Sequence, residues 1–123
     1  MDWQNENLIQ PDSTGFIYLI THNTTGEYYI GKKNLQSYTT IKKKKVYKES
    51  NWRQYYGSNK EFLSYIKEQG KEMFTRTILC VCCSPYKLTY TELKYQILLD
   101  WENDNCWNSN LLGKFYKNKV RND

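Results

Sequence analysis

The chain is poor in the residues and runs that several protein classes require. It has one histidine, two prolines and six glycines in 123 residues. Its longest apolar run, residues 78–83, is far shorter than the roughly 20 residues of a membrane-spanning helix. Its first residues are polar and acidic, without the apolar region of a signal peptide. These absences predict a cytoplasmic protein with no membrane partner.

The four cysteines are not spaced as a metal site. Cys80, Cys82 and Cys83 lie close together, and on a strand the first two would face one side and the third the other. Structural zinc sites usually show paired C-x₂-C units, and the single histidine, His22, is far away in the sequence. We expect free, mostly buried thiols, with no zinc and no disulfide, as in a reducing compartment.

The chain is rich in aromatic residues, and its charge is uneven. Twelve Tyr, four Trp and four Phe argue against disorder, and the length suits one domain with one core. The net charge is +5, yet residues 32–48 hold seven lysines and no acid, and residues 114–121 hold four more basic residues. The remainder is therefore acidic. This pattern indicates a polyanionic partner such as nucleic acid, although a solvated lysine-rich loop stays open.

Turn signals and side-chain patterns place a β-hairpin near the N-terminus. Residues 1–14 are polar and are expected to be a flexible lead-in to a single domain over residues 15–123. Residues 16–20 and 27–31 are β-branched and aromatic and flank an Asn-Thr-Thr-Gly turn. We predict that residue 20 pairs with residue 29 and residue 18 with residue 31, which puts two tyrosines on one face.

The rest of the chain predicts a loop, two helices and a third strand. Residues 32–57 show little periodicity and are expected to be a lysine-rich insertion or long loop. A capping box with Ser58 as its cap begins a helix that Gly70 ends. Residues 74–83 read as a strand, and Ser84 caps a second helix that should run to about Trp101. The expected fold is α+β, a small three-stranded antiparallel sheet flanked by helices.

Two short sequences stand out on the predicted hairpin: Gly-Phe-Ile-Tyr at residues 15–18 and Tyr-Ile-Gly at residues 29–31. Together they resemble the GIY-YIG nuclease superfamily, which carries its two triplets on adjacent antiparallel strands at a similar spacing. A glutamate on a later helix and an aromatic-Asn pair follow in the superfamily, and here Glu92 and Trp107-Asn108 occupy those places. The segment around residues 52–60 also resembles small phage-encoded members.

The chain departs from the family pattern at two places. Phe16 stands where the first triplet has glycine, although the tyrosine is kept at Tyr18. The family's arginine, about ten residues after the second tyrosine, would fall on Thr39. Arg53, or one of the lysines at residues 42–45, is expected to supply that positive charge.

The resemblance implies a metal-dependent endonuclease that hydrolyses DNA phosphodiester bonds with one Mg²⁺ or Mn²⁺ ion held by Glu92. Such an ion activates water and neutralises charge on the phosphate. Tyr18 would act as, or near, the general base, with its pKa lowered by the metal ion and by Lys32 or Lys33, and Tyr29 would contact water or phosphate. The full set of candidates is Tyr18, Tyr29, Lys33, Arg53, Glu92 and Asn108 for catalysis, and Lys32, Lys42, Lys43, Lys44, Lys45, Tyr56, Ser58 and Lys60 for DNA binding.

Several of these residues have structural alternatives. Residues 89–92 form a capping-box pattern of their own, so Glu92 could merely close a helix. A helix that starts at Ser84 instead leaves Glu92 on an apolar face beside Leu88, where a carboxylate is costly unless something binds it. Asn108 could be a turn residue or could brace the site. Without the motif, the two tyrosines would be read as core.

Two other functions stay open at this stage. The first is a catalytically inactive nucleic-acid-binding module, and the second is an interaction protein that docks a partner through exposed aromatics and lysines. The oligomeric state also stays open: a monomer with one active site would nick DNA, whereas a dimer could cut both strands.

Overall fold

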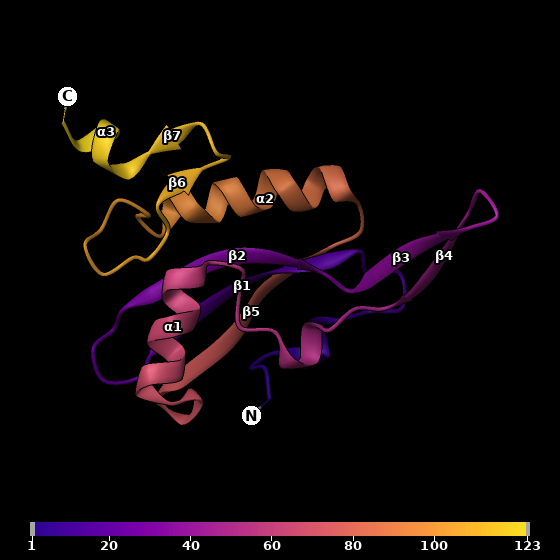
Figure 1. The fold of residues 1–123 in the computed structure, drawn as a ribbon, viewed down its shortest axis with the longest axis horizontal. Helices are drawn as coiled ribbons and strands as arrows, with labels where there is room; N and C mark the ends of the chain where they lie inside the picture. Colours follow the sequence, from indigo (N-terminus) through magenta and orange to yellow (C-terminus); the bar gives the residue numbers. More distant parts are fainter. Residues whose placement is uncertain (1, 123) are drawn as a thin grey trace.

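The computed structural model describes residues 2–122 and shows a central sheet with a long hairpin that projects from one end (Figure 1). The elements, in chain order, are η1 (Glu6–Leu8), β1 (Gly15–His22), β2 (Tyr28–Asn34), β3 (Gln36–Ile41), β4 (Lys44–Glu49), η2 (Trp52–Gln54), α1 (Lys60–Gln69), η3 (Lys71–Met73), β5 (Phe74–Cys82), α2 (Pro85–Leu98), β6 (Asn110–Leu111), β7 (Phe115–Tyr116) and α3 (Lys117–Arg121). No helix among the described residues is long and apolar enough to span a bilayer.

The central sheet has the order β2-β1-β5, with both pairs antiparallel. The hairpin register is the predicted one: Ile20 pairs with Tyr29 and Tyr18 pairs with Gly31. The third strand lies beside β1 rather than β2, so β1 is central and β2 is an edge strand. The α+β fold and the three-stranded antiparallel sheet are therefore confirmed.

Alternation along β1 sends side chains into two separate cores. Phe16 and Tyr18 point to one face, where they pack with Phe62 of α1. Ile17 points to the other face, where it packs with Leu88 of α2. Because a strand residue faces the side opposite to its neighbours, this one strand anchors both helices. The helices therefore cover the two faces of the sheet (Figure 1).

Both helices begin near the predicted residues. Ser84 caps α2 by accepting a hydrogen bond from the backbone N–H of Lys87 at 3.1 Å, with Pro85 at the first helical position. The helix ends at Leu98, three residues before the expected Trp101, which is buried beyond it. The cap of α1 is Asn59, whose side chain accepts from Phe62 N–H at 3.0 Å, so Ser58 as the cap was wrong by one residue.

Both edges of the sheet are covered. At the β5 edge, Gln4 donates to the carbonyl of Arg76 at 2.7 Å and its own carbonyl accepts from Ile78 N–H at 3.0 Å. At the β2 edge, Tyr28 N–H donates to the carbonyl of Asn105 at 2.9 Å, and the carbonyl of Tyr28 accepts from Trp107 N–H at 2.8 Å. Two segments remote in sequence therefore close the sheet.

The expectation that residues 32–57 form an irregular loop was wrong. Strand β2 continues to Asn34, and β3 and β4 pair in a regular antiparallel hairpin whose two-residue turn is Lys42-Lys43. Both turn residues have positive φ, 50° and 66°, as a type I′ turn requires. All of the hairpin except Ser37 is exposed, so no buried face imposes the apolar periodicity that marks a strand.

The segment before β1 also differs from the flexible lead-in that the sequence suggested. Trp3 is 3% exposed, belongs to the core on the α1 face, and donates its indole N–H to the carbonyl of Trp52 at 2.9 Å. The backbone of Gln4 forms a bridge with Thr77 of β5. One buried aromatic side chain in a polar stretch is therefore enough to pack this segment onto the domain. Residue 1 lies outside the described residues.

Candidate functional site

A polar cavity of about 330 Å³ lies where the edge strand β2 meets both helices and the β6–β7 turn. It is lined by Tyr29, Asn59, Glu92, Gln96, Asn108, Ser109, Asn110, Leu112 and Gly113. Three of the predicted catalytic residues, Tyr29, Glu92 and Asn108, therefore meet here from three separate segments. A cavity with polar walls and one acidic side chain suits a charged, hydrated ligand better than an apolar one.

The two tyrosines of the motif lie beside each other, and Tyr29 lines this cavity. The rings of Tyr18 and Tyr29 are 6.2 Å apart between centroids. Tyr18 is buried, with 1% exposure, and it lies across the strand from Gly31. A Cβ added at Gly31 would be 2.4 Å from the Tyr18 hydroxyl oxygen, so only glycine leaves room for this phenol. The glycine of the second triplet therefore makes room for the tyrosine of the first.

The environment of Tyr18 keeps its hydroxyl protonated. Burial raises the pKa of Tyr18 well above its usual value, and the nearby Tyr29 and Tyr55 raise it further. The pKa of Tyr29 is also raised by burial, although a hydrogen bond with the side chain of Ser58 lowers it in part. We expected a bound metal and Lys32 or Lys33 to lower the pKa of Tyr18. Neither lysine is among the groups that shift it, and with both pKa values raised, both phenols can donate a hydrogen bond at neutral pH.

Glu92 lies inside α2, so its alternative role as a helix cap was wrong. The cap is Ser84, and Thr89 lies within the helix, where its hydroxyl accepts a hydrogen bond from Lys32 Nζ at 2.7 Å. Burial raises the pKa of the Glu92 carboxyl, and the charge of Lys32 and a hydrogen bond from its backbone lower it in part. The carboxylate is half-buried and borders a polar cavity. Lys32 offsets only part of the cost of burying its negative charge, which favours binding of a cation.

The side chain of Asn108 accepts from the Cys106 thiol at 3.1 Å and makes two hydrogen bonds with the edge strand. Its Oδ1 accepts from Ile30 N–H at 2.9 Å, and its Nδ2 donates to the Ile30 carbonyl at 2.7 Å. Gln96 Nε2 donates to the same carbonyl at 3.3 Å. These contacts replace the missing neighbour strand at Ile30. They match the bracing role that the sequence left open for Asn108.

The lysines after the second triplet lie on opposite faces of β2. Lys32 reaches Thr89 on the α2 side, whereas Lys33 lies over the ring of Tyr55, with its ammonium 4.2 Å from the ring centroid. Burial lowers the pKa of Lys33. Lys33 thus contacts the ring of Tyr55, and Tyr55 in turn is hydrogen-bonded to Tyr18.

Several predicted site residues do not reach the cavity. Arg53 is exposed and pairs with Glu49 at 3.1 Å. Tyr56 is buried in the core, where the guanidinium of Arg76 lies 4.2 Å from its ring centroid. Lys60 is the exposed first residue of α1 and does not line the cavity. The remaining four, Lys42, Lys43, Lys44 and Lys45, lie at the end of the projecting hairpin.

The structure adds three residues to the site that sequence reasoning missed. Tyr55, rather than Tyr56, contacts Tyr18, with ring centroids 5.9 Å apart. Gln96 lies one helical turn after Glu92, a spacing that could have identified it. Asn59 caps α1 and also donates to the carbonyl of Trp107 at 3.3 Å, which ties the helix to the segment that carries Asn108.

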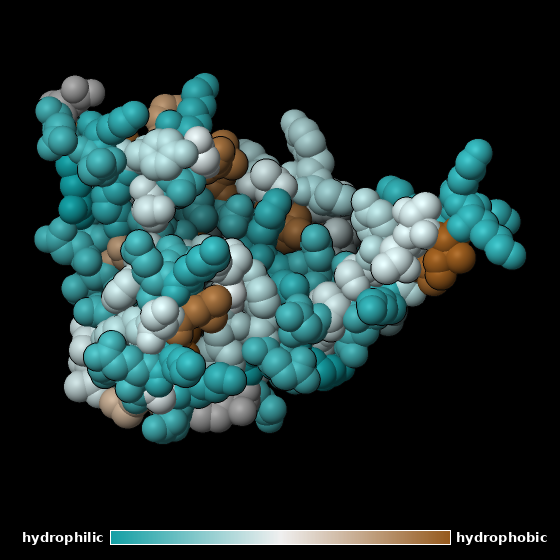
Figure 2. All heavy atoms as spheres, viewed as in Figure 1, coloured by the Kyte–Doolittle hydropathy of each residue, from teal (hydrophilic) through white to brown (hydrophobic). Residues whose placement is uncertain are grey.

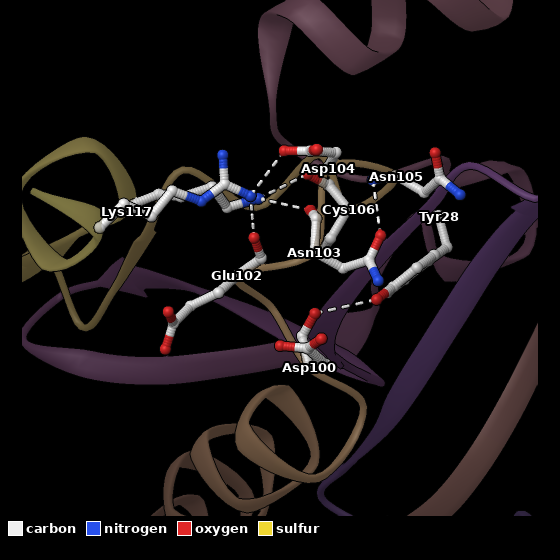
Figure 3. Close-up of polar contacts among 9 residues, drawn as sticks. Tyr28, Asp100, Glu102, Asn103, Asp104, Asn105, Cys106 and Lys117 are labelled. Atoms are coloured by element: carbon white, nitrogen blue, oxygen red, sulfur yellow. Dashed lines mark hydrogen bonds and ion pairs between the residues drawn. The ribbon is translucent and has the colours of Figure 1, made fainter.

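The second basic segment of the sequence holds the C-terminal part in place. Lys117 Nζ donates to the carbonyl of Cys106 at 2.7 Å and to that of Asn103, and Arg121 pairs with Asp104 at 2.8 Å (Figure 3). On the far side of this loop, the Tyr28 hydroxyl donates to the carbonyl of Leu99 at 2.8 Å. Two of the four cations at residues 114–121 are thus used internally and are poorly placed to bind a polyanion.

Glu92 brings one carboxylate to the cavity, where it is available to a hydrated divalent cation. Within residues 2–122, no three His, Cys, Asp or Glu side chains gather as a metal cage. Mg²⁺ suits such a place, because it keeps several waters and commonly takes only one or two protein carboxylates. The amide and hydroxyl groups of Asn59, Gln96 and Ser109 line the same space and can hydrogen-bond those waters.

The comparisons agree with the geometry. A family model described as "Putative endonuclease segE, GIY-YIG domain" matches residues 3–119, which is nearly the whole chain. No curated protein and no solved structure matched the chain. The match includes both triplets on β1 and β2, the helix that carries Glu92 and the segment that carries Asn108. The chain therefore belongs to the segE-type GIY-YIG family of endonucleases.

Proposed function

We propose that the protein is a metal-dependent endonuclease that hydrolyses phosphodiester bonds of DNA and is encoded by a phage or mobile element. The observation that carries the proposal is the convergence of Glu92, Tyr29 and Asn108 on one polar cavity at the edge of β2. Among the described residues, no other acidic side chain lines that cavity. The half-buried carboxylate of Glu92 would therefore be the group that holds the cation. Bound there, Mg²⁺ or Mn²⁺ would polarise water and offset charge on the phosphate.

The residues around Glu92 have distinct parts in this proposal. Tyr29 lines the cavity with a protonated hydroxyl that can donate a hydrogen bond to a phosphate oxygen or orient a water. Tyr18 lies behind it and fixes the ring of Tyr29 by contact. The raised pKa of Tyr18 opposes a phenolate at that position, so Tyr18 is better suited to positioning than to general-base catalysis. Asn108 holds the strand that presents Tyr29.

The test is cleavage of supercoiled plasmid by the purified protein with Mg²⁺, Mn²⁺ or EDTA. We expect cleavage with either metal and none with EDTA. Glu92→Gln keeps the shape of the side chain but loses the charge, and should abolish cleavage while leaving DNA binding intact. Glu68→Gln, at an exposed position of α1, is the matched control and should cleave as the wild type does. Cleavage by Glu92→Gln, or cleavage in EDTA, would contradict the proposal.

A further inference from the structure

The projecting hairpin, made of β3 and β4, carries exposed aromatic and apolar side chains together with lysines. Tyr38, Ile41 and Tyr47 are 54%, 55% and 58% exposed, respectively, and a group of exposed apolar side chains is more informative than a single one. Figure 2 shows a hydrophobic patch at the end of the hairpin, flanked by hydrophilic side chains. The hairpin contributes nothing to either core cluster, so its regular pairing is not explained by stability of the domain.

The charge of the hairpin identifies the kind of partner. Residues 36–49 hold five lysines and one acid, and that acid, Glu49, is paired with Arg53 outside the hairpin. Among residues 2–122, none of the five lysines is in an ion pair with a carboxylate. A surface with this balance attracts a polyanion rather than an apolar protein. Because the chain belongs to an endonuclease family, nucleic acid is the polyanion that fits this surface best.

The two faces of the hairpin differ. The register places Tyr38 opposite Tyr47 on one face, where Lys45 lies 4.6 Å from the Tyr38 ring centroid and Glu49 lies at the base. The other face has no acidic residue and consists of Ser37, Thr39, Ile41, Lys44, Val46 and Lys48. This second face combines two lysines with short hydroxyl and apolar side chains. Lysines suit phosphates and guanine edges, and apolar side chains suit the thymine methyl group.

The form of the hairpin fits one groove of duplex DNA. The major groove is wide enough to admit a two-stranded ribbon, whereas the minor groove is about half that width. Because β3 follows directly on β2, the hairpin points away from the cavity along one continuous path (Figure 1). Ten residues separate Tyr29 from Thr39, which is at most about 33 Å of strand. That length is close to one turn of B-DNA.

We propose that the β3–β4 hairpin lies in the major groove of duplex DNA, about one helical turn from the phosphodiester bond held at the Glu92 cavity. The proposal rests on the proposed function for the position of the cut, but not for the binding itself. The face with Lys44 and Lys48 meets the bases and backbone, and the Lys42-Lys43 turn extends along the groove. The hairpin thereby sets where on a duplex the cavity is placed.

The hairpin can be deleted between two residues that already lie next to each other. Ser50 N–H donates to the carbonyl of Leu35 at 2.9 Å, so the two ends of the hairpin are adjacent. A variant that replaces residues 36–49 with Asn-Gly between Leu35 and Ser50 should keep both cores. A second variant, Lys44→Ala with Lys48→Ala, leaves the backbone unchanged. Its control is Lys67→Ala with Lys94→Ala, which removes the same charge from exposed positions on α1 and α2.

The experiment measures binding in EDTA to a duplex and to a single strand of the same sequence, with hydroxyl-radical footprinting and methylation interference. The wild type should protect about one helical turn on one side of the cleavage position, with interference at guanine N7 in the major groove. The hairpin-less variant should lose that protection and bind at least tenfold more weakly, and it should nick plasmid with metal only at correspondingly higher protein concentration. The double lysine variant should lower the log–log salt slope by about 2, and its control should not.

Other outcomes overturn the proposal. An unchanged footprint without the hairpin would remove it from the interface. Interference at adenine N3 alone would place it in the minor groove, and equal affinity for single strands would exclude a duplex groove. A wild-type chain that shows the hairpin footprint but never nicks contradicts the proposed function alone. A wild-type chain that nicks without a hairpin footprint contradicts this inference alone.

Discussion

At the scale of single residues, the site depends on one missing side chain. Gly31 leaves the space that the Tyr18 hydroxyl occupies, and Tyr18 in turn supports the ring of Tyr29. The positions of Tyr18 and Tyr29 therefore depend on packing against the backbone at Gly31 as well as on the two tyrosine side chains themselves. The same space explains why the second triplet needs its glycine.

A methyl group at residue 31 should disturb the tyrosines. In Gly31→Ala the Cβ would be 2.4 Å from the hydroxyl oxygen of Tyr18 and 2.6 Å from its Cζ. The buried ring cannot move freely, so we expect a loss of about 1–3 kcal/mol in the free energy of unfolding and a large loss of cleavage. Chemical denaturation and plasmid nicking measure the two effects.

Gly26→Ala is the control for this prediction. Gly26 has a φ of +78°, but nothing lies within 4 Å of its Cβ position. The variant should lose about 1 kcal/mol through backbone strain while folded protein cleaves at the wild-type rate. Equal loss of cleavage in both variants would show that Gly31 matters only for stability.

The raised pKa of Glu92 predicts how stability depends on pH. Its folded-state pKa lies above the ordinary value of 4.5, because burial disfavours the carboxylate. The native state therefore binds this proton more tightly than the unfolded chain does. That contribution to stability is complete below 4.5 and is lost as the pH rises through the folded-state value. Glu92→Gln cannot titrate, so relative to wild type it should gain stability from acid to neutral pH.

Denaturant unfolding of both proteins across that pH range is the measurement. A constant difference between them would mean that Glu92 titrates normally. Adding Mg²⁺ at neutral pH should stabilise the wild type but not Glu92→Gln, because an ion that binds only the native state shifts the folding equilibrium.

The site residues fall into two groups by how well sequence could identify them. Glu92 and Tyr29 have fixed places in the motif, and the cavity contains both. Tyr55 and Tyr56 are adjacent and identical, so only the backbone of the 52–59 segment decides which faces Tyr18 and which faces Arg76. A pattern of residue types carries no such information about an irregular segment.

At the scale of elements, the sequence predicted well wherever a face is buried. Strands β1, β2 and β5 and helix α2 have an apolar side and clear end signals, and each begins within one residue of its expected position. The β3–β4 hairpin has neither a buried face nor a glycine or asparagine in its turn, so both ordinary strand signals are missing. Its pairing depends on backbone hydrogen bonds and on the contact between the rings of Tyr38 and Tyr47.

The Lys42-Lys43 turn predicts a gain in local stability. Both residues hold positive φ, which Asn and Gly adopt at lower cost than lysine. Changing Lys42→Asn together with Lys43→Gly should stabilise the hairpin by about 1–2 kcal/mol. Because the hairpin lies outside both cores, the gain should appear as slower amide hydrogen exchange in β3 and β4, with little change in Tm.

The opposite result is informative as well. Exchange that stays fast after this change would mean that the turn does not limit the stability of the hairpin. A higher Tm would mean that the hairpin unfolds together with the cores.

At the scale of the whole molecule, the exposed positive charge is concentrated on one projecting segment, the β3–β4 hairpin. The hairpin, which carries five lysines, projects from one end of the longest axis, and the C-terminal segment lies at the other end (Figure 1). In the latter, Lys117 and Arg121 bind carbonyls and Asp104. The basic residues of the two segments therefore differ in availability, which composition alone does not reveal.

This difference predicts the salt dependence of DNA binding. Changing Lys42, Lys43, Lys44 and Lys45 together to Ala should lower the log–log salt slope by as much as about 3.6, if each lysine neutralises one phosphate. Folding should be unaffected, because the four side chains are exposed. Binding titrations across a salt series give the slope. The control, with Lys67, Lys87, Lys94 and Lys119 changed to Ala, should keep the wild-type slope.

The covered edges of the central sheet have a consequence for association between copies of the chain. An open strand edge pairs readily with another strand, and here residues 4–5 and 105–108 occupy both edges of the sheet. In the part of the chain that the structure describes, the hairpin edges have no such cover and are protected chiefly by the repulsion of their lysines. Whatever neutralises those lysines also removes the barrier to strand-to-strand aggregation, so a nuclease stored without its substrate should stay soluble longest at low ionic strength.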